Sequence, residues 1–192
     1  MKSNIQIIII VTVLITSCFL FSACQINGTS QGLIGYYNKT KDLSPDLLVE
    51  DYPEENLCNV KNDSVPQIYI VNGIALKKCI SQSSEALLYI WSPHCKGKYC
   101  YSFDLLQEYC TNKKLELFIV AEYYDYDLMN KNYIIDKPIF GIDTKHYHTQ
   151  FTSQYRSKFI FDLTQQNQYF QGNFFYFQEG IFIKSVENLD SL

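Results

Sequence analysis

The stretch LLYIWSPHCKGKYCYSFDLL, residues 87–106, joins an apolar run to two closely spaced cysteines and then to the start of an amphipathic segment. The apolar run ALLYIW, residues 86–91, is typical of a strand buried on both faces. Residues 99–113 repeat apolar side chains at helical spacing, and LELFIVAE, residues 115–122, indicates a second buried strand. A strand, a helix and a strand of these lengths predict two parallel neighbouring strands with a right-handed crossover.

Segments on both sides extend this unit. Strands are expected at QIYIVNG (67–73), ALKKCI (75–80), KFIFDL (158–163), FFYF (174–177) and IFIKSV (181–186), and helices at 126–135 and 143–156. Asn72 and Gly73, a pair favoured in hairpin turns, would join the first two strands, and the last two would form another hairpin. The sequence therefore predicts an α/β fold with a mixed sheet flanked by helices, preceded by an N-terminal extension.

The N-terminus resembles a bacterial lipoprotein signal. Lys2 precedes IQIIIIVTVLITSCFLFSAC, an apolar run that ends in small residues and a cysteine. The resemblance implies cleavage before Cys24 and acylation of that residue; Cys18 offers a competing frame, and residues 5–23 also approach the length of an uncleaved membrane anchor. We expect a signal peptide at 1–23, a tether at 24–50 and a domain at 51–192, lipid-anchored in the cell envelope and facing outside the cytoplasm.

Cysteines outside the cytosol tend to be oxidised in pairs. Cys110 shares the helical spacing of an apolar face, so we expect it to be a small core side chain. Cys58 and Cys79 would close a loop of about twenty residues as a structural disulfide, contributing about 3 kcal/mol. Cys95 and Cys100 remain as a second pair.

The segments LLYIWSPHC and FFYFQEGIFIKSV resemble the thioredoxin-like superfamily, particularly its membrane-tethered envelope members. The resemblance covers residues 65–188 and implies that Cys95 is the attacking cysteine, supported by Trp91 and Pro93. His94, Lys96 and Lys98 would favour its thiolate. Gly172 stands where the family places a cis-proline.

The second cysteine departs from the family pattern. It stands five residues after Cys95 instead of three, and five residues on a regular helix leave two side chains about 140° apart. Gly97 permits a non-helical loop through Lys96 and Lys98, with the helix starting near Tyr99, so that the sulfurs of Cys95 and Cys100 could meet.

These residues predict an envelope thiol:disulfide oxidoreductase-like lipoprotein that uses a Cys-x4-Cys pair and acts on protein thiols or disulfides. The alternative is a non-catalytic thioredoxin-fold lipoprotein with structural disulfides, serving binding or structure. A metal site built from cysteines with His94, His146 or His148 is a weaker alternative, because histidines two apart on a helix point to different faces.

Other chemistry finds little support in the sequence. A net charge of −4, with 16 basic residues spread along the chain and not clustered, argues against a nucleic-acid partner. Motifs for phosphate cradles, serine nucleophile elbows and zinc proteases are absent from the sequence, and we expect no cofactor. The acidic run EYYDYD, residues 122–127, is expected to be a solvated turn.

Overall fold

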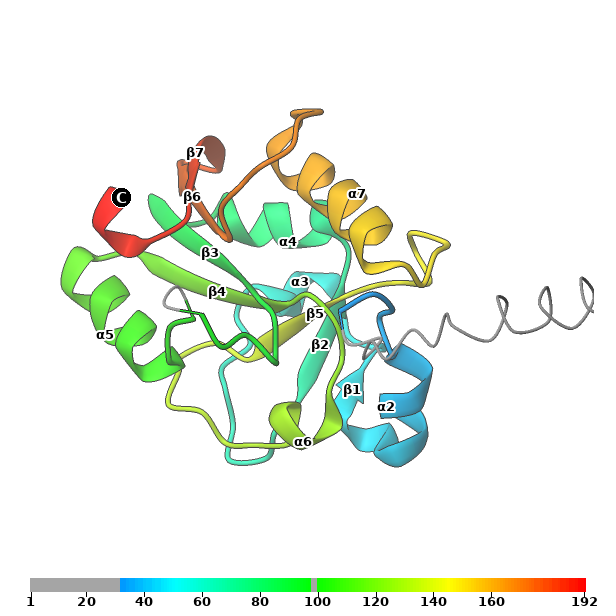
Figure 1. The fold of residues 1–192 in the computed structure, drawn as a ribbon. Helices are drawn as coiled ribbons and strands as arrows, with labels where there is room; N and C mark the ends of the chain where they lie inside the picture. Colours follow the sequence, from blue (N-terminus) through cyan, green and yellow to red (C-terminus); the bar gives the residue numbers. More distant parts are fainter. Residues whose placement is uncertain (1–31, 98–99) are drawn as a thin grey trace, which may run out of the picture. The chain divides into compact units, whose positions relative to one another are not determined.

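Seven strands form one mixed sheet in the order β1-β2-β5-β4-β3-β6-β7 (Figure 1). The computed structural model describes residues 32–97 and 100–192. The strands are β1 (Leu48–Val49), β2 (Ile68–Val71), β3 (Glu85–Trp91), β4 (Glu116–Ala121), β5 (Ile139–Ile142), β6 (Phe174–Gln178) and β7 (Ile181–Val186). The helices are α2 (Tyr37–Leu43), α3 (Glu54–Leu57), α4 (Gly73–Ile80), α5 (Phe103–Lys113), α6 (Tyr126–Met129) and α7 (Thr152–Thr164), with short 3-10 turns at Pro45–Leu47 and Leu189–Ser191.

The central strand β3 is buried on both faces. Alternate side chains such as Leu88 and Ile90 enter one core, and their neighbours Leu87 and Tyr89 enter the other. Strand β3 pairs in parallel with β4 and antiparallel with β6, which forms a hairpin with β7. The predicted parallel pair and the predicted C-terminal hairpin are therefore confirmed.

Helices cover both faces of the sheet. Side chains of α3, α4 and α7 fill one core, while those of α2, α5 and α6 fill the other. Helices α4 and α7 contact each other, and α5 connects β3 to β4 on the opposite face (Figure 1). The predicted α/β fold with a mixed sheet flanked by helices is confirmed, and its layout agrees with the thioredoxin-like one.

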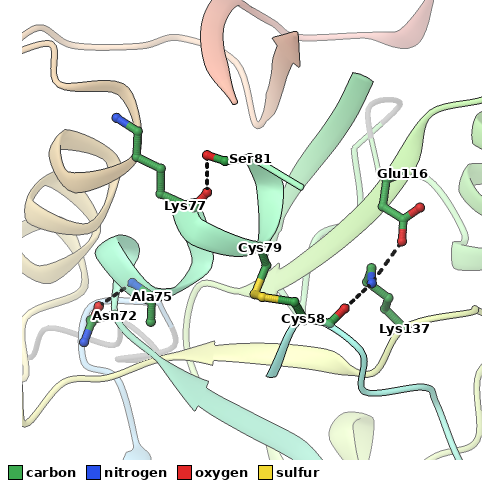
Figure 2. The surroundings of a disulfide bond; sticks show 8 residues. All are labelled: Cys58, Asn72, Ala75, Lys77, Cys79, Ser81, Glu116 and Lys137. Carbon is green, nitrogen blue, oxygen red and sulfur yellow. Dashed lines mark hydrogen bonds and ion pairs between the residues drawn. A yellow bond between two sulfur atoms is a disulfide. The ribbon is translucent and has the colours of Figure 1, made fainter. Parts of the chain in front are cut away.

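The prediction of a strand at ALKKCI was wrong, because these residues belong to α4. Asn72 does not form a hairpin turn; its Oδ1 accepts a hydrogen bond from Ala75 N at 2.8 Å and caps the helix (Figure 2). Leu76, Cys79 and Ile80 face the core at helical spacing. A short apolar run allows either structure, and packing against α7 favours the helix here.

Three further secondary-structure predictions, all after residue 125, were wrong. KFIFDL is the second half of α7, because Phe159 and Leu163 continue the four-residue spacing that begins at Tyr155. The helix expected at 143–156 therefore lies at Thr152–Thr164, and residues 144–148 form turns. The helix expected at 126–135 ends at Met129, after which the carbonyl of Tyr133 accepts a hydrogen bond from the Asn62 side chain.

The described part of the expected tether belongs to the domain. Helix α2 packs into the core through Tyr37, and β1 pairs with β2 at the edge of the sheet. The folded region therefore begins before residue 51, while residues 24–31, including Cys24, and the expected signal peptide lie outside the described residues. Among the residues that the structure describes, no helix has the length and apolar character needed to cross a membrane.

Candidate redox site

Three chain segments meet at one edge of the sheet. Strands β3 and β4 are parallel and end there, while β6 is antiparallel to β3 and begins there. Glu122 N donates to Trp91 O at 2.8 Å, and Ile90 N donates to Asn173 O at 2.8 Å. The residues that follow β3, those that follow β4 and those that precede β6 are thus held next to one another.

The loop after β3 carries a disulfide between Cys95 and Cys100, whose Cα atoms lie 5.8 Å apart. The Cys95 side chain is exposed and Cys100 is half-buried. Gly97 N donates to Cys100 Sγ at 2.9 Å, and Cys100 N donates to Gly97 O at 3.1 Å. Lys96 and Gly97 are non-helical, as expected, while Lys98 and Tyr99 lie outside the described residues.

Helix α5 begins at Phe103, not near Tyr99 as predicted, and its N-cap residue is Ser102. Residues 100–102 are extended or irregular. Cys95 therefore lies outside the first turn of α5, which is the turn in which helix-terminal amides act most strongly.

Trp91 and Pro93, which precede the two cysteines in the sequence, are buried. Trp91 is 8% exposed, and its ring meets Phe103 edge-on at a centroid distance of 4.9 Å and Tyr133 at 6.2 Å. Pro93 is also buried. Both residues are therefore buried just before the exposed Cys95.

His94, immediately before Cys95, is bonded at two points to the segment after β4. Its backbone N donates to Tyr123 Oη at 3.0 Å, and its ring Nε2 lies 2.7 Å from Asp125 Oδ2. The His94 ring is nearly parallel to the Tyr123 ring at a centroid distance of 6.3 Å. Burial raises the pKa of Tyr123, so its hydroxyl stays protonated at neutral pH.

A carboxylate and a guanidinium extend these contacts into the protein. Ser92 Oγ donates to the carboxylate of Glu122, and Arg156 Nε of α7 lies 3.1 Å from Glu122 Oε1. The Nε group is not aligned for a hydrogen bond, so this contact is an ion pair between two largely buried side chains. The other end of Arg156 donates to Asn173 Oδ1 at 3.0 Å.

The expectation that EYYDYD is a solvated turn was wrong. Tyr123 and Tyr124 are 5% and 2% exposed, and the acidic side chains on either side of them contact the cysteine loop or its neighbours. The sequence held one signal for this arrangement, namely that the run directly follows a buried strand, where the ends of parallel strands converge. Arg156 was also missed, although it is the only arginine in the sequence.

Gly172 lies where two backbones touch. A Cβ atom at this position would overlap the carbonyl group of Val186 in β7 and come within 2.9 Å of Glu187 N. None of the described peptide bonds is cis, so this segment differs from the cis-proline loop of the thioredoxin-like family. Close packing against β7, not a backbone turn, requires glycine here.

The histidines outside the loop take no part in the site. His146 and His148 are exposed in the turns between β5 and α7, and His146 N donates to the carboxylate of Asp143. Within residues 32–97 and 100–192, no group of three histidine, cysteine or acidic side chains is placed to hold a metal ion.

A second disulfide lies away from the loop. It joins Cys58, at the end of α3, to Cys79 of α4, with Cα atoms 4.7 Å apart (Figure 2). Lys137 donates to Cys58 O at 2.9 Å and forms an ion pair with Glu116 at 2.9 Å. Cys110 is a buried free thiol, as predicted, and burial raises its pKa to about 12, which makes it a poor nucleophile.

Comparisons of this chain with protein-family models, with curated proteins and with solved structures found no match. The function is therefore inferred from the chemistry of the described residues.

Proposed function

We propose that the protein is an envelope thiol:disulfide oxidoreductase of thioredoxin-like type, in which Cys95 is the attacking cysteine and Cys100 resolves the intermediate. The observation that carries the proposal is the unequal exposure of a bonded pair at the end of β3. Cys95 is exposed while Cys100 is half-buried, so an incoming sulfur reaches Cys95 first.

The chemistry proceeds by two exchanges. The Cys95 thiolate attacks one sulfur of a substrate disulfide, forms a mixed disulfide and releases the other substrate sulfur as a thiolate, which takes up a proton. Cys100, once deprotonated, then attacks Cys95 Sγ, re-forms the Cys95–Cys100 bond and releases the second substrate thiol. Two electrons pass from the protein to the substrate, and the reverse sequence oxidises a substrate dithiol.

A non-catalytic protein with structural disulfides is the second candidate, and specific features favour it. Cys95 is not part of the first turn of α5, where helix-terminal amides act most strongly on a thiolate. The carboxylates of Glu122 and Asp125 border the loop and would oppose a nearby thiolate. Gly172 replaces the proline that the family uses beside its cysteines. If the protein shows no thiol–disulfide exchange, these features therefore support a binding or structural role.

Cysteine substitutions separate the two candidates. Cys95→Ser is expected to abolish exchange with a model protein disulfide, because the exposed nucleophile is lost. Cys100→Ser is expected to accumulate a mixed disulfide between Cys95 and the substrate, visible by mass spectrometry and reversed by reductant. Cys110→Ala serves as the control and should leave exchange unchanged, because this thiol is buried.

The reduction potential of the Cys95–Cys100 pair decides the same question independently. A value near those of known oxidoreductases supports exchange, whereas structural disulfides lie below roughly −300 mV. A potential in that low range, together with alkylation of reduced Cys95 no faster than that of a peptide thiol, would establish the non-catalytic role.

We also propose that the mature chain begins at Cys24 and is lipid-anchored. The motive is Lys2, the apolar run and the small residues before Cys24. Mass spectrometry of the N-terminal peptide is expected to show an acylated Cys24. Cys24→Ser should abolish this modification, whereas Cys18→Ser should leave it intact. A retained Met1, or acylation of Cys18, would contradict the assignment.

A further inference from the structure

The segment after β4, Glu122–Asp125, holds the cysteine loop at successive points. Ser92 Oγ donates to Glu122, His94 N donates to Tyr123 Oη, and the His94 ring bonds to Asp125. Cys95 N in turn donates to Ser92 O at 2.9 Å. The residues that precede Cys95 are therefore fixed from one side by a segment that is itself the continuation of a core strand.

The same segment is anchored on its inner side. The Glu122 carboxylate pairs with Arg156, and Arg156 bonds to Asn173, whose own carbonyl accepts from Ile90 in β3. Tyr155 Oη donates to Glu122 O at 2.5 Å. Asp125 Oδ1 accepts from Leu128 N at 3.0 Å and caps α6. Bonds to α7, to β3 and to α6 thus fix the segment before it contacts the loop.

We propose that Glu122, Tyr123 and Asp125 are positioning residues that set the stability of the Cys95–Cys100 disulfide. They hold Ser92 and His94 so that Cys95 Sγ lies in reach of Cys100 Sγ, which raises the effective concentration of one thiol at the other. This inference rests on the proposed function, because it concerns the same disulfide. None of these residues exchanges electrons; each acts through the geometry of the loop.

The direction of the effect follows from the reaction with a dithiol. Dithiothreitol reduces the protein disulfide to two thiols and is itself oxidised to a cyclic disulfide, so two electrons and two protons move to the protein. Once reduced, the loop has greater freedom around the exposed Gly97, and the contacts to the segment limit that freedom. Loss of one contact should therefore make ring closure less favourable and the disulfide easier to reduce.

The test measures the thiol–disulfide equilibrium between dithiothreitol and the full chain, which is purified in detergent. Tyr123→Phe removes only the hydroxyl that accepts from His94, and Glu122→Gln removes the charge that pairs with Arg156. Each is expected to shift the equilibrium of Cys95–Cys100 about tenfold toward the thiols, which corresponds to a potential about 30 mV less negative. Alkylation followed by mass spectrometry reports both disulfides separately.

The chain offers matched controls at the far ends of the same strands. Tyr176→Phe removes a hydroxyl that donates to Glu85, at the start of β3, and Glu116→Gln removes a charge that pairs with Lys137, at the start of β4. Both should leave Cys95–Cys100 unchanged. The Cys58–Cys79 disulfide is the internal reference and should be unchanged in Tyr123→Phe and Glu122→Gln.

Unchanged potentials in Tyr123→Phe and Glu122→Gln would overturn the inference, as would equal shifts of both disulfides, which indicate general destabilisation. The measurement needs no catalytic turnover. A wild-type pair that fails to exchange with substrates, yet shifts in the variants, would therefore refute the proposed function and leave the positioning role standing.

Discussion

Replacing Gly172 with alanine is expected to destabilise the protein by at least about 3 kcal/mol, at the upper end of the cost of overpacking. The added Cβ would overlap the carbonyl group of Val186, which belongs to β7, so neither side chain rotation nor a small shift relieves the contact. The segment would have to move away from the hairpin. That movement would also carry away Asn173, which bonds to Ile90 and Arg156.

Urea unfolding measures this effect, and Gly97→Ala is the matched control. Among the described residues, a Cβ at Gly97 would meet Cys100 Sγ at 3.8 Å, which is an ordinary contact. We expect the unfolding midpoint of Gly97→Ala to stay close to that of the wild type. A Gly172→Ala protein as stable as the wild type would show that the backbone of β7 is not held against residue 172 in solution.

Removing the Cys58–Cys79 disulfide is expected to cost about 3 kcal/mol, because the unfolded chain regains the entropy of a loop of about twenty residues. The bond joins two elements, α3 and α4, that otherwise meet through Leu57 and the side chains of α4 in one core. Alanine at both positions avoids placing a hydroxyl at Cys79, which is 2% exposed. The measured quantity is the free energy of unfolding without reductant.

The pair Cys95→Ala and Cys100→Ala provides the comparison. Its five-residue separation predicts a smaller loss, about 2 kcal/mol on the same chain-entropy account. Because this loop is bordered by exposed residues, the variant should keep its core and its secondary structure. A larger loss from the short loop than from Cys58 and Cys79 would contradict the assignment of the second disulfide as the stabilising one.

The sheet could be predicted from the sequence wherever the apolar pattern was long or closed by a turn. ALLYIW and the LFIVA portion of LELFIVAE are continuous apolar runs, which suit strands covered on both faces. The C-terminal hairpin was marked by Glu179 and Gly180, both of which adopt positive φ in the structure. In each case the local pattern and the tertiary environment favoured the same structure.

Predictions from short apolar runs were wrong where the local pattern and the tertiary environment favoured different structures. ALKKCI and KFIFDL fit a strand when considered alone, whereas in the structure both lie in helices, α4 and α7, that contact each other. Asn72 has the same preference for a turn and for a helix cap, so its identity did not choose between them. Residues 37–49 join the sheet because β1 pairs with β2. The sequence did not reveal that these two strands are neighbours.

The residues of the candidate site also fall into a group that the sequence predicted and a group that it did not. The bonded cysteines and the packing of Trp91 lie within one continuous stretch, and local reasoning placed them together. Glu122, Arg156 and Asn173 come from three separate elements that meet only because β3, β4 and β6 share an edge. Their proximity is a property of strand order, which the spacing of residues along the chain does not reveal.

The strand order also governs when the protein can fold. Strand β3 is flanked by β4, which follows closely in the sequence, and by β6, which arrives late; Glu85 and Tyr176, bonded across this second edge, are 91 residues apart. During synthesis, one edge of the most apolar strand therefore stays open until nearly the whole chain exists. Contacts of such long range slow folding and leave an unpaired edge available to other chains. The last strands to be made thus complete the centre of the sheet, and the nascent chain depends on them for protection from aggregation.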